Sequence, residues 1–292
     1  MAGVIVNSDS KIGDHCILNT RSALDHDCEL GDFSSLAPGA TTGGKVSIGA
    51  FSVIALGATA PTADSAIIRL TGVEKEYRTG KLSYRALRGV DLAIEPREMV
   101  AIVGPSGSGK TTILNLVSGI DRPTAGAVTV TGRRIDTLDE DELATWRGRH
   151  VGIVFQFFQL LPTLTAVENA TLPMDFARVG KPRERAARAL HNLDLVGLVD
   201  KANHLPVELS GGEQQRVAIA RALASDPPIL MGDELTGNLD SDTANEMFNL
   251  LTRLNQAGTT IVYVTHDNGL AERSPRVVTI RDGLVVGDFR RV

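Results

Sequence analysis

A glycine-rich segment that ends in Lys110-Thr111 has the composition and spacing of a phosphate-binding loop. Residues 104–111 read GPSGSGKT and match the pattern G-x-x-x-x-G-K-[ST]. An apolar strand is predicted before them, and a helix after them at 112–118. Glycine N–H groups there can surround the β- and γ-phosphates, Lys110 adds a positive charge, and the Thr111 hydroxyl can coordinate Mg²⁺. We therefore expect a nucleoside triphosphate site that contains Gly104, Pro105, Ser106, Gly107, Ser108, Gly109, Lys110, Thr111 and Thr112.

An acidic pair closes a second apolar strand. Asp233 and Glu234 directly follow ILMG at 229–232. Ionised carboxylates at the end of a buried strand need a metal or another partner to offset their desolvation. Asp233 is suited to bind Mg²⁺, and Glu234 is suited to act as general base toward an attacking water. The sequence thus predicts hydrolysis of the bound triphosphate.

The segment LSGGEQQ at 209–215 begins a predicted helix. Ser210 and Glu213 have the spacing of a capping box, in which each side chain binds the backbone N–H of the other residue. The segment lies after the phosphate loop and before ILMGDE. In that order the three segments resemble the ATP-binding cassettes of ABC transporters, and the resemblance covers residues 66–292.

This resemblance implies roles for further residues. Tyr77 in VEKEYRTG matches the aromatic residue that stacks on adenine, and His266 in VYVTHD matches the switch histidine that contacts the γ-phosphate. Gln156 in VFQFFQLLP matches the glutamine that faces the membrane subunit, senses Mg²⁺ and completes the metal site with Thr111 and Asp233. The ATP-binding residues also include Asp240 of the D-loop segment GNLD and, supplied by a second subunit, Ser210, Gly211 and Gly212.

The segments GNLDS, QFFQLLP and RDGLVV are most similar to those of lipoprotein-releasing and macrolide-exporting transporters. The resemblance implies an ATP-hydrolysing subunit that forms a homodimer around ATP and drives transport through separately encoded membrane subunits, on the inner face of the cell membrane. Leu235 departs from the family, which usually has proline there, but the change removes no ligand. The alternative is a regulatory or scaffolding ATPase that is not coupled to transport.

The composition agrees with a globular protein that has no electrostatic attraction to nucleic acid. Of 292 residues, 42% are hydrophobic and 22% charged, and the formal net charge is -5. No apolar run approaches the ~20 residues of a membrane span, and the first residues lack the pattern of a secretory signal, so we expect a cytoplasmic chain. Cys16 and Cys28 are expected to be reduced.

Before residue 60, aliphatic residues recur every six positions. They are Val6, Ile12, Leu18, Leu24, Leu30, Leu36, Ile48 and Ile54, with Thr42 as the exception. This period predicts a β-helix in which about 18 residues make one turn and the aliphatic side chains stack inside. Gly13, Gly31 and Gly49 recur once per turn, and we expect them at corners that need the backbone freedom of glycine.

The repeat segment also resembles the hexapeptide-repeat sugar acetyltransferases of the sialic-acid O-acetyltransferase type. The resemblance implies that His26 is a general base in an acetyl-CoA-dependent reaction. The second histidine of that family is replaced here by Ser35, and its sugar-binding domain is missing. If the chain is not a bifunctional enzyme, three alternatives exist for the repeat segment: a structural remnant, a fused fragment or an interaction module. The fusion could be natural, engineered or artefactual.

The expected fold therefore has two parts. Residues 1–59 are predicted to form a left-handed parallel β-helix of about three coils, and residues 60–66 a linker. Residues 67–292 are predicted to form an α/β P-loop NTPase, an ABC cassette with a helical signature subdomain, because apolar strand-like runs alternate there with helical segments.

Overall fold

The computed structural model describes residues 3–44, 46–49, 52–54, 59–60, 66–80, 82–177, 179–235 and 240–291. The chain divides into two compact units, Met1–Ala66 and Ile67–Val292, which are considered separately. Residues 61–65 of the predicted linker lie outside the described ranges. In the part of the chain that is described, no helix has the length and apolar character needed to cross a membrane.

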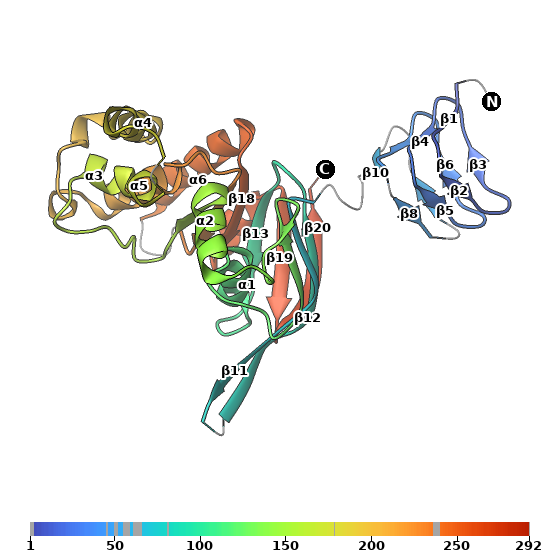
Figure 1. Cartoon of the computed structure of the whole chain (residues 1–292), viewed down its shortest axis with the longest axis horizontal. Coiled ribbons are helices and arrows are strands. Elements are labelled where there is room, and N and C mark those ends of the chain that lie inside the picture. Colours follow the sequence, from blue (N-terminus) through green and yellow to red (C-terminus); the bar gives the residue numbers. More distant parts are fainter. Residues whose placement is uncertain are drawn as a thin grey trace. The chain divides into compact units, whose positions relative to one another are not determined.

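The first unit consists of two-residue strands that recur every six residues. The strands up to Thr41–Thr42 each pair in parallel with the strand 18 residues further along, as Ile5 does with Ala23. The pairings form sheets in the orders β1-β4-β7-β10, β2-β5-β8 and β3-β6-β9, visible as stacked short arrows in Figure 1. The strands are β1 (Ile5–Val6), β2 (Lys11–Ile12), β3 (Ile17–Leu18), β4 (Ala23–Leu24), β5 (Glu29–Leu30), β6 (Ser35–Leu36), β7 (Thr41–Thr42), β8 (Ser47–Ile48), β9 (Val53–Ile54) and β10 (Thr59–Ala60).

From Gly3 to Gly39, the turn before each strand places one residue in the left-handed conformation. The residues are Gly3, Asp9, His15, Arg21, Asp27, Phe33 and Gly39, with φ between 57° and 75°. In the Ala37–Ala40 turn the first carbonyl oxygen accepts a hydrogen bond from the fourth N–H, and its Pro-Gly centre is the pair that a type II turn favours. The period of six is therefore a period of turns as well as of strands.

The glycines predicted at the corners, Gly13, Gly31 and Gly49, are not the residues with positive φ, so that prediction is corrected. The left-handed residue comes two positions later, as His15 does after Gly13. Glycine is needed at position 13 for another reason, because a Cβ there would lie 2.8 Å from the backbone nitrogen of Asp32 on the next coil.

The interior of this unit is aliphatic from the second coil onward. Thr42, the exception to the repeat, is buried, and its Oγ1 accepts a hydrogen bond from the Asp25 N–H at 2.9 Å. The predicted burial is wrong for the first coil, where Val6 and Ile12 are 45% and 42% exposed. Within the described residues β1, β2 and β3 each end a sheet, so this coil has a neighbour on one side only. The buried core is Leu24, Cys28, Leu30, Leu36, Ala40, Val46 and Ile48.

The second unit contains two sheets. An antiparallel sheet has the order β12-β11-β14-β15, and a second sheet has the order β16-β17-β18-β13-β19-β20 with only β20 antiparallel. The strands are β11 (Ile68–Thr79), β12 (Leu82–Ile94), β13 (Met99–Val103), β14 (Ala125–Val130), β15 (Arg133–Arg134), β16 (Val151–Val154), β17 (Ile229–Asp233), β18 (Thr260–Val264), β19 (Arg276–Arg281) and β20 (Leu284–Arg290).

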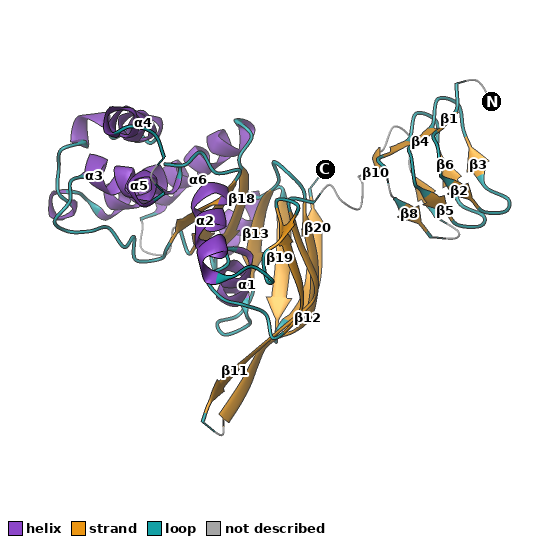
Figure 2. Cartoon of the chain, viewed as in Figure 1, coloured by secondary structure: helices purple, strands orange, loops and turns teal. Residues whose placement is uncertain are grey.

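The helices of this unit fall into two groups. Figure 2 shows α3, α4 and α5 gathered at the end of the unit away from β12 and β20, while α1 and α2 lie beside the sheets. The former three pack against one another and form the predicted helical subdomain. The helices are α1 (Lys110–Val117), α2 (Glu140–His150), α3 (Ala166–Phe176), α4 (Pro182–Leu195), α5 (Gly211–Ala222), α6 (Ser241–Gln256) and α7 (Asn268–Arg273).

The parallel strands determine where the functional side chains lie. Strands β16, β17, β18 and β13 are neighbours and run in the same direction, so their carboxyl ends meet at one edge of the sheet. Ligands of open α/β sheets bind at this edge. The segments that contain Gln156, Asp233-Glu234, His266 and the phosphate loop begin there.

Candidate active site

The phosphate loop connects β13 to α1, as the sequence predicts. Gly104, Gly107 and Gly109 have φ of 151°, 76° and 105°, a region that side chains disfavour. A Cβ at Gly104 would collide with the carbonyl oxygen of Ile280, and a Cβ at Gly109 would lie 2.7 Å from the carbonyl oxygen of Ala86. The loop therefore needs glycine for its conformation and for its packing.

Lys110 is buried at the first residue of α1. Its Nζ donates hydrogen bonds to the carbonyl oxygens of Gly104 at 2.9 Å and Pro105 at 2.8 Å. Burial lowers the pKa of Lys110, and the carboxylates of Glu234 and Asp233 oppose this shift. The buried Ser108 Oγ has no hydrogen-bond partner. A charged ammonium and an unsatisfied hydroxyl in one loop fit an anionic, hydrogen-bonding ligand such as a polyphosphate.

Thr111 and Asp233 bring two oxygen donors together beside this loop. The Thr111 hydroxyl donates to Asp233 Oδ2 at 3.1 Å. Burial raises the pKa of the Asp233 carboxyl, so its ionised form gains from a nearby cation. Within the described ranges, His, Cys, Asp and Glu do not form a metal-binding cluster of three or more. One carboxylate and one hydroxyl fit Mg²⁺, which takes its other ligands from water and phosphates.

Glu234 lies at the centre of a polar cluster. Gln156 Nε2 donates to Glu234 Oε2 at 2.6 Å, and His266 Nδ1 lies 3.2 Å from Glu234 Oε1. Glu234 itself has φ of 53°, and its N–H donates to the Val264 carbonyl oxygen at 3.0 Å. The structure thus brings together three side chains that the sequence separates, and it holds the carboxylate by both oxygens.

A cavity of about 360 Å³ joins the loop to this cluster. Its lining includes Gly104, Ser106, Gly107, Gly109, Lys110, Thr111, Thr112, Glu234 and His266 from the predicted site. A phosphate loop, a candidate Mg²⁺ site and a candidate base around one cavity are the parts of a nucleoside triphosphatase.

Two tyrosines flank the loop, and the sequence singled out only one of them. The Tyr77 hydroxyl donates to Asp121 Oδ2 at 2.8 Å, and Lys75 Nζ lies 4.8 Å from its ring centroid. Burial raises the pKa of Tyr77, as does the bond to Asp121. Tyr84 lines the cavity instead, and its hydroxyl donates to the Gly107 carbonyl oxygen at 2.6 Å. The signal for Tyr84 is its position two residues after Leu82, where β12 begins, as Tyr77 is two residues before Thr79, where β11 ends; this pairs the two tyrosines across the hairpin.

Of the described signature and D-loop residues, Ser210, Gly211, Gly212 and Asp240 do not line this cavity. Ser210 caps α5, and the predicted capping box with Glu213 is confirmed, with the Ser210 N–H donating to Glu213 Oε2 at 2.8 Å. Asp240 caps α6 by accepting hydrogen bonds from the Thr243 and Asp242 N–H groups. The D-loop residues 237–239 lie outside the described ranges. The contact of these segments with ATP from a second subunit stays a prediction.

His26 lies in the other unit, on a turn. Its Nδ1 is 2.9 Å from Asp27 Oδ2, and about half of each side chain is exposed. A carboxylate at this distance can orient an imidazole. The role of His26 as a base stays a prediction.

Comparison with known proteins establishes the family. The sequence family described as "ABC transporter" matches residues 87–237. YknY of Bacillus subtilis (strain 168), an uncharacterized ABC transporter ATP-binding protein, is 47% identical over 220 residues, which are 75% of this chain and 95% of YknY. The chain belongs to the ABC transporter family, as an ATP-binding subunit and ATPase.

Three further relatives show which members it is similar to. The lipoprotein-releasing system ATP-binding protein LolD of Aquifex aeolicus (strain VF5) is 45% identical, over 77% of this chain and 99% of LolD. The macrolide export ATP-binding/permease protein MacB of Rhodopseudomonas palustris (strain HaA2) is 46% identical, over 76% of this chain but 34% of MacB. A dimeric post-hydrolysis structure of the ATP-binding cassette MJ0796, bound to ADP and Pi, is 44% identical with a TM-score of 0.72, over 76% of this chain and 98% of that one.

Proposed function

We propose that this chain is the motor subunit of an exporter-type ABC transporter and that Glu234 is its general base. The observation that carries the proposal is the position of Glu234, held by Gln156 and His266 at the cavity that also contains Lys110. The similarity to LolD and MacB supports a transporter of the lipoprotein-releasing or macrolide-exporting type.

Different residues of the chain are assigned to phosphate binding, Mg²⁺ binding and proton transfer. The phosphate loop and Lys110 bind the β- and γ-phosphates, and Tyr77 provides a surface for adenine. Thr111, Asp233 and Gln156 would hold Mg²⁺, which neutralises charge on the phosphates when bound. Glu234 accepts a proton from the attacking water, while Gln156 and His266 fix the direction of its carboxylate.

A twofold dimer completes each site. Ser210, Gly211 and Gly212 are at the N-terminus of α5, where backbone N–H groups attract anions. Since they do not line the cavity of their own chain, we assign them to the γ-phosphate of the partner chain, together with Asp240. The dimeric structure of MJ0796, which is 44% identical, supports this assembly.

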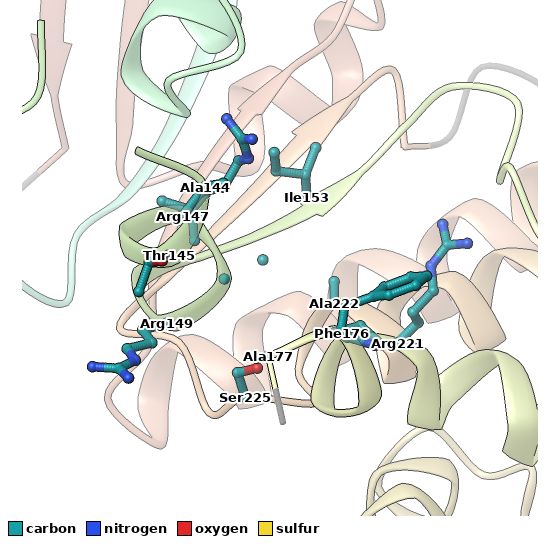
Figure 3. A pocket seen from close by; sticks show the side chains of 14 residues that line it. Ala144, Thr145, Arg147, Arg149, Ile153, Phe176, Ala177, Arg221, Ala222 and Ser225 are labelled. Atoms are coloured by element: carbon teal, nitrogen blue, oxygen red, sulfur yellow. The ribbon is translucent and has the colours of Figure 1, made fainter. Parts of the chain in front are cut away.

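A groove between the two groups of helices is the proposed contact for the membrane subunits. Figure 3 shows a pocket of about 540 Å³ with Arg147 from α2 on one side and Phe176 and Arg221 from α3 and α5 on the other. A neighbouring cavity of about 670 Å³ shares these three residues and adds Leu161, from the segment after Gln156. Phe176 is 80% exposed, as an interface residue of an isolated subunit would be. Docking there would place the chain on the inner face of the membrane.

If the membrane subunits bind in this groove, a substitution there should impair their binding without impairing ATP hydrolysis. Phe176→Glu should leave the ATPase activity of the isolated chain within about twofold, because Phe176 does not line the nucleotide cavity, and should reduce binding to the membrane subunits about tenfold or more. Phe289→Glu, at an exposed aromatic residue of β20, is the matched control. Measurement requires ATPase assays and co-purification with the transporter's membrane subunits. Unimpaired binding by Phe176→Glu would exclude this groove.

For the first unit we propose a short left-handed parallel β-helix. Its support is the parallel pairing of strands 18 residues apart, the three sheets, and the left-handed turn residue at every sixth position from Gly3 to Gly39. The family match at 87–237 does not reach this unit, and we assign no acetyl transfer to His26.

Separation of the two units predicts that residues 66–292 fold and hydrolyse ATP alone. Among the described residues, the hydrophobic clusters of the cassette and the side chains packed against them begin at Ile67, and every predicted ATP-site residue lies after it. We expect kcat/KM for ATP within about twofold of the full chain, as for an independent domain. A truncated chain that melts cooperatively yet lacks ATPase activity would show that the first unit is integral to the enzyme.

A further inference from the structure

Tyr84 lies at the mouth of the nucleotide cavity, on β12. Its side chain is 55% exposed, it contributes to the cavity lining, and its hydroxyl donates to the Gly107 carbonyl oxygen at 2.6 Å. Gly107 is in the middle of the phosphate loop and has φ of 76°. A half-exposed phenol is thus tied to the loop that binds phosphates.

Strand β12 touches the same loop directly at Gly109 and is linked to it through Gly283 at a further point. The Ala86 carbonyl oxygen and the Leu87 side chain lie against Gly109, where they leave no room for a Cβ. The Arg88 N–H donates to the Gly283 carbonyl oxygen at 2.9 Å, and the Gly283 N–H donates to the Ser108 carbonyl oxygen at 3.1 Å. At the outer end of the loop, the Tyr84 side chain makes the corresponding link.

Tyr77 lies on the neighbouring strand β11, opposite Tyr84. Tyr77 and Tyr84 are directly opposite each other in the β11–β12 hairpin, and opposed residues project from the same face of an antiparallel pair. The Tyr77 hydroxyl is held by Asp121, with a further interaction to Thr112 in the first turn of α1. The two tyrosines therefore fasten the hairpin to the phosphate loop at Gly107 and to Asp121, in the segment that follows α1.

We infer that Tyr84 is a positioning residue of the nucleotide site, which fixes the phosphate loop at Gly107 relative to the base platform at Tyr77. The inference rests on the proposed roles of the loop and of Tyr77. A nucleotide contacts both at once, so its affinity depends on how firmly their separation is held before it binds. A ligand with phosphates but no base does not depend on that separation.

The inference is tested by comparing a ligand that has both base and phosphates with one that has phosphates alone. Dissociation constants for a non-hydrolysable ATP analogue and for inorganic triphosphate, each with Mg²⁺, are measured by calorimetry on the full chain. Tyr84→Phe removes only the hydroxyl and should weaken binding of the analogue about three- to tenfold, the effect of one lost hydrogen bond, while triphosphate affinity changes less than about twofold. Leu82→Ala is the control, because Leu82 is on the same strand, is 79% exposed and does not line the cavity. Thermal unfolding of each variant checks that the fold is retained.

Two results would overturn the inference. Unchanged affinity for the ATP analogue in Tyr84→Phe would show that the hydroxyl positions nothing. Equal losses for the analogue and for triphosphate would show that Tyr84 shapes only the loop and does not link it to the base platform. Failure of the wild-type chain to bind either ligand would instead refute the proposed site, so the two failures are distinguishable.

Discussion

Glu234→Gln is expected to lower the rate of ATP hydrolysis about 10²–10⁴-fold and to leave ATP binding intact. The amide cannot take a proton from water. It has the shape of the carboxylate, and its oxygen can still accept the hydrogen bond from Gln156. Asp233 and Thr111, which would hold Mg²⁺, are unchanged. Closed dimers should therefore accumulate with ATP, while the chain without nucleotide stays largely monomeric.

Steady-state ATPase assays and light scattering measure these effects. Glu246→Gln is the matched control, since Glu246 is an exposed carboxylate on α6 that pairs with Arg216 at 3.4 Å. Undiminished turnover in Glu234→Gln would remove Glu234 from the role of base. A stable trimer with and without ATP would contradict the twofold assembly and make the first unit the organising domain.

The sequence determines the second unit well because its motifs coincide with the ends of predicted strands. The phosphate loop follows β13 and Asp233-Glu234 ends β17, as the apolar runs indicate. The contacts of Gln156 and His266 with Glu234 could not be read from periodicity, since they depend on the order of strands in the sheet. Resemblance to the family placed both at the site, and the structure adds the hydrogen bond and the close approach that hold the carboxylate.

Tyr84 shows what pattern reasoning misses. The hairpin register pairs it with Tyr77, but its hydrogen bond to Gly107 joins two segments that local sequence does not connect. In the first unit the period of six predicts the strands correctly and the corners incorrectly. A glycine can recur once per coil because the backbone needs a conformation that side chains disfavour, or because a neighbouring coil leaves no room for a Cβ. The second reason applies to Gly13.

Lys110→Ala is expected to act on binding rather than on the chemical step. The Lys110 ammonium is the buried cation of the loop, close enough to Asp233 and Glu234 for their carboxylates to oppose the lowering of its pKa. When ATP binds, we expect the ammonium to exchange the carbonyl oxygens of Gly104 and Pro105 for phosphate oxygens. Loss of one such charge-assisted interaction should weaken ATP binding about ten- to a hundredfold.

Comparing the affinities of Lys110→Ala for ATP, ADP and AMP shows which phosphates Lys110 contacts. Lys110 is expected to reach the β- and γ-phosphates, so affinity for ATP and ADP should fall together while affinity for AMP changes little. Lys11→Ala is the control for net charge, because Lys11 is exposed in the first unit and pairs only with Glu29 among the ion pairs of the described residues. Binding is measured by calorimetry with Mg²⁺ present. ATP affinity within twofold of the wild-type value in Lys110→Ala would mean that the loop does not hold the phosphates, whereas an equal loss for AMP would place Lys110 at the α-phosphate.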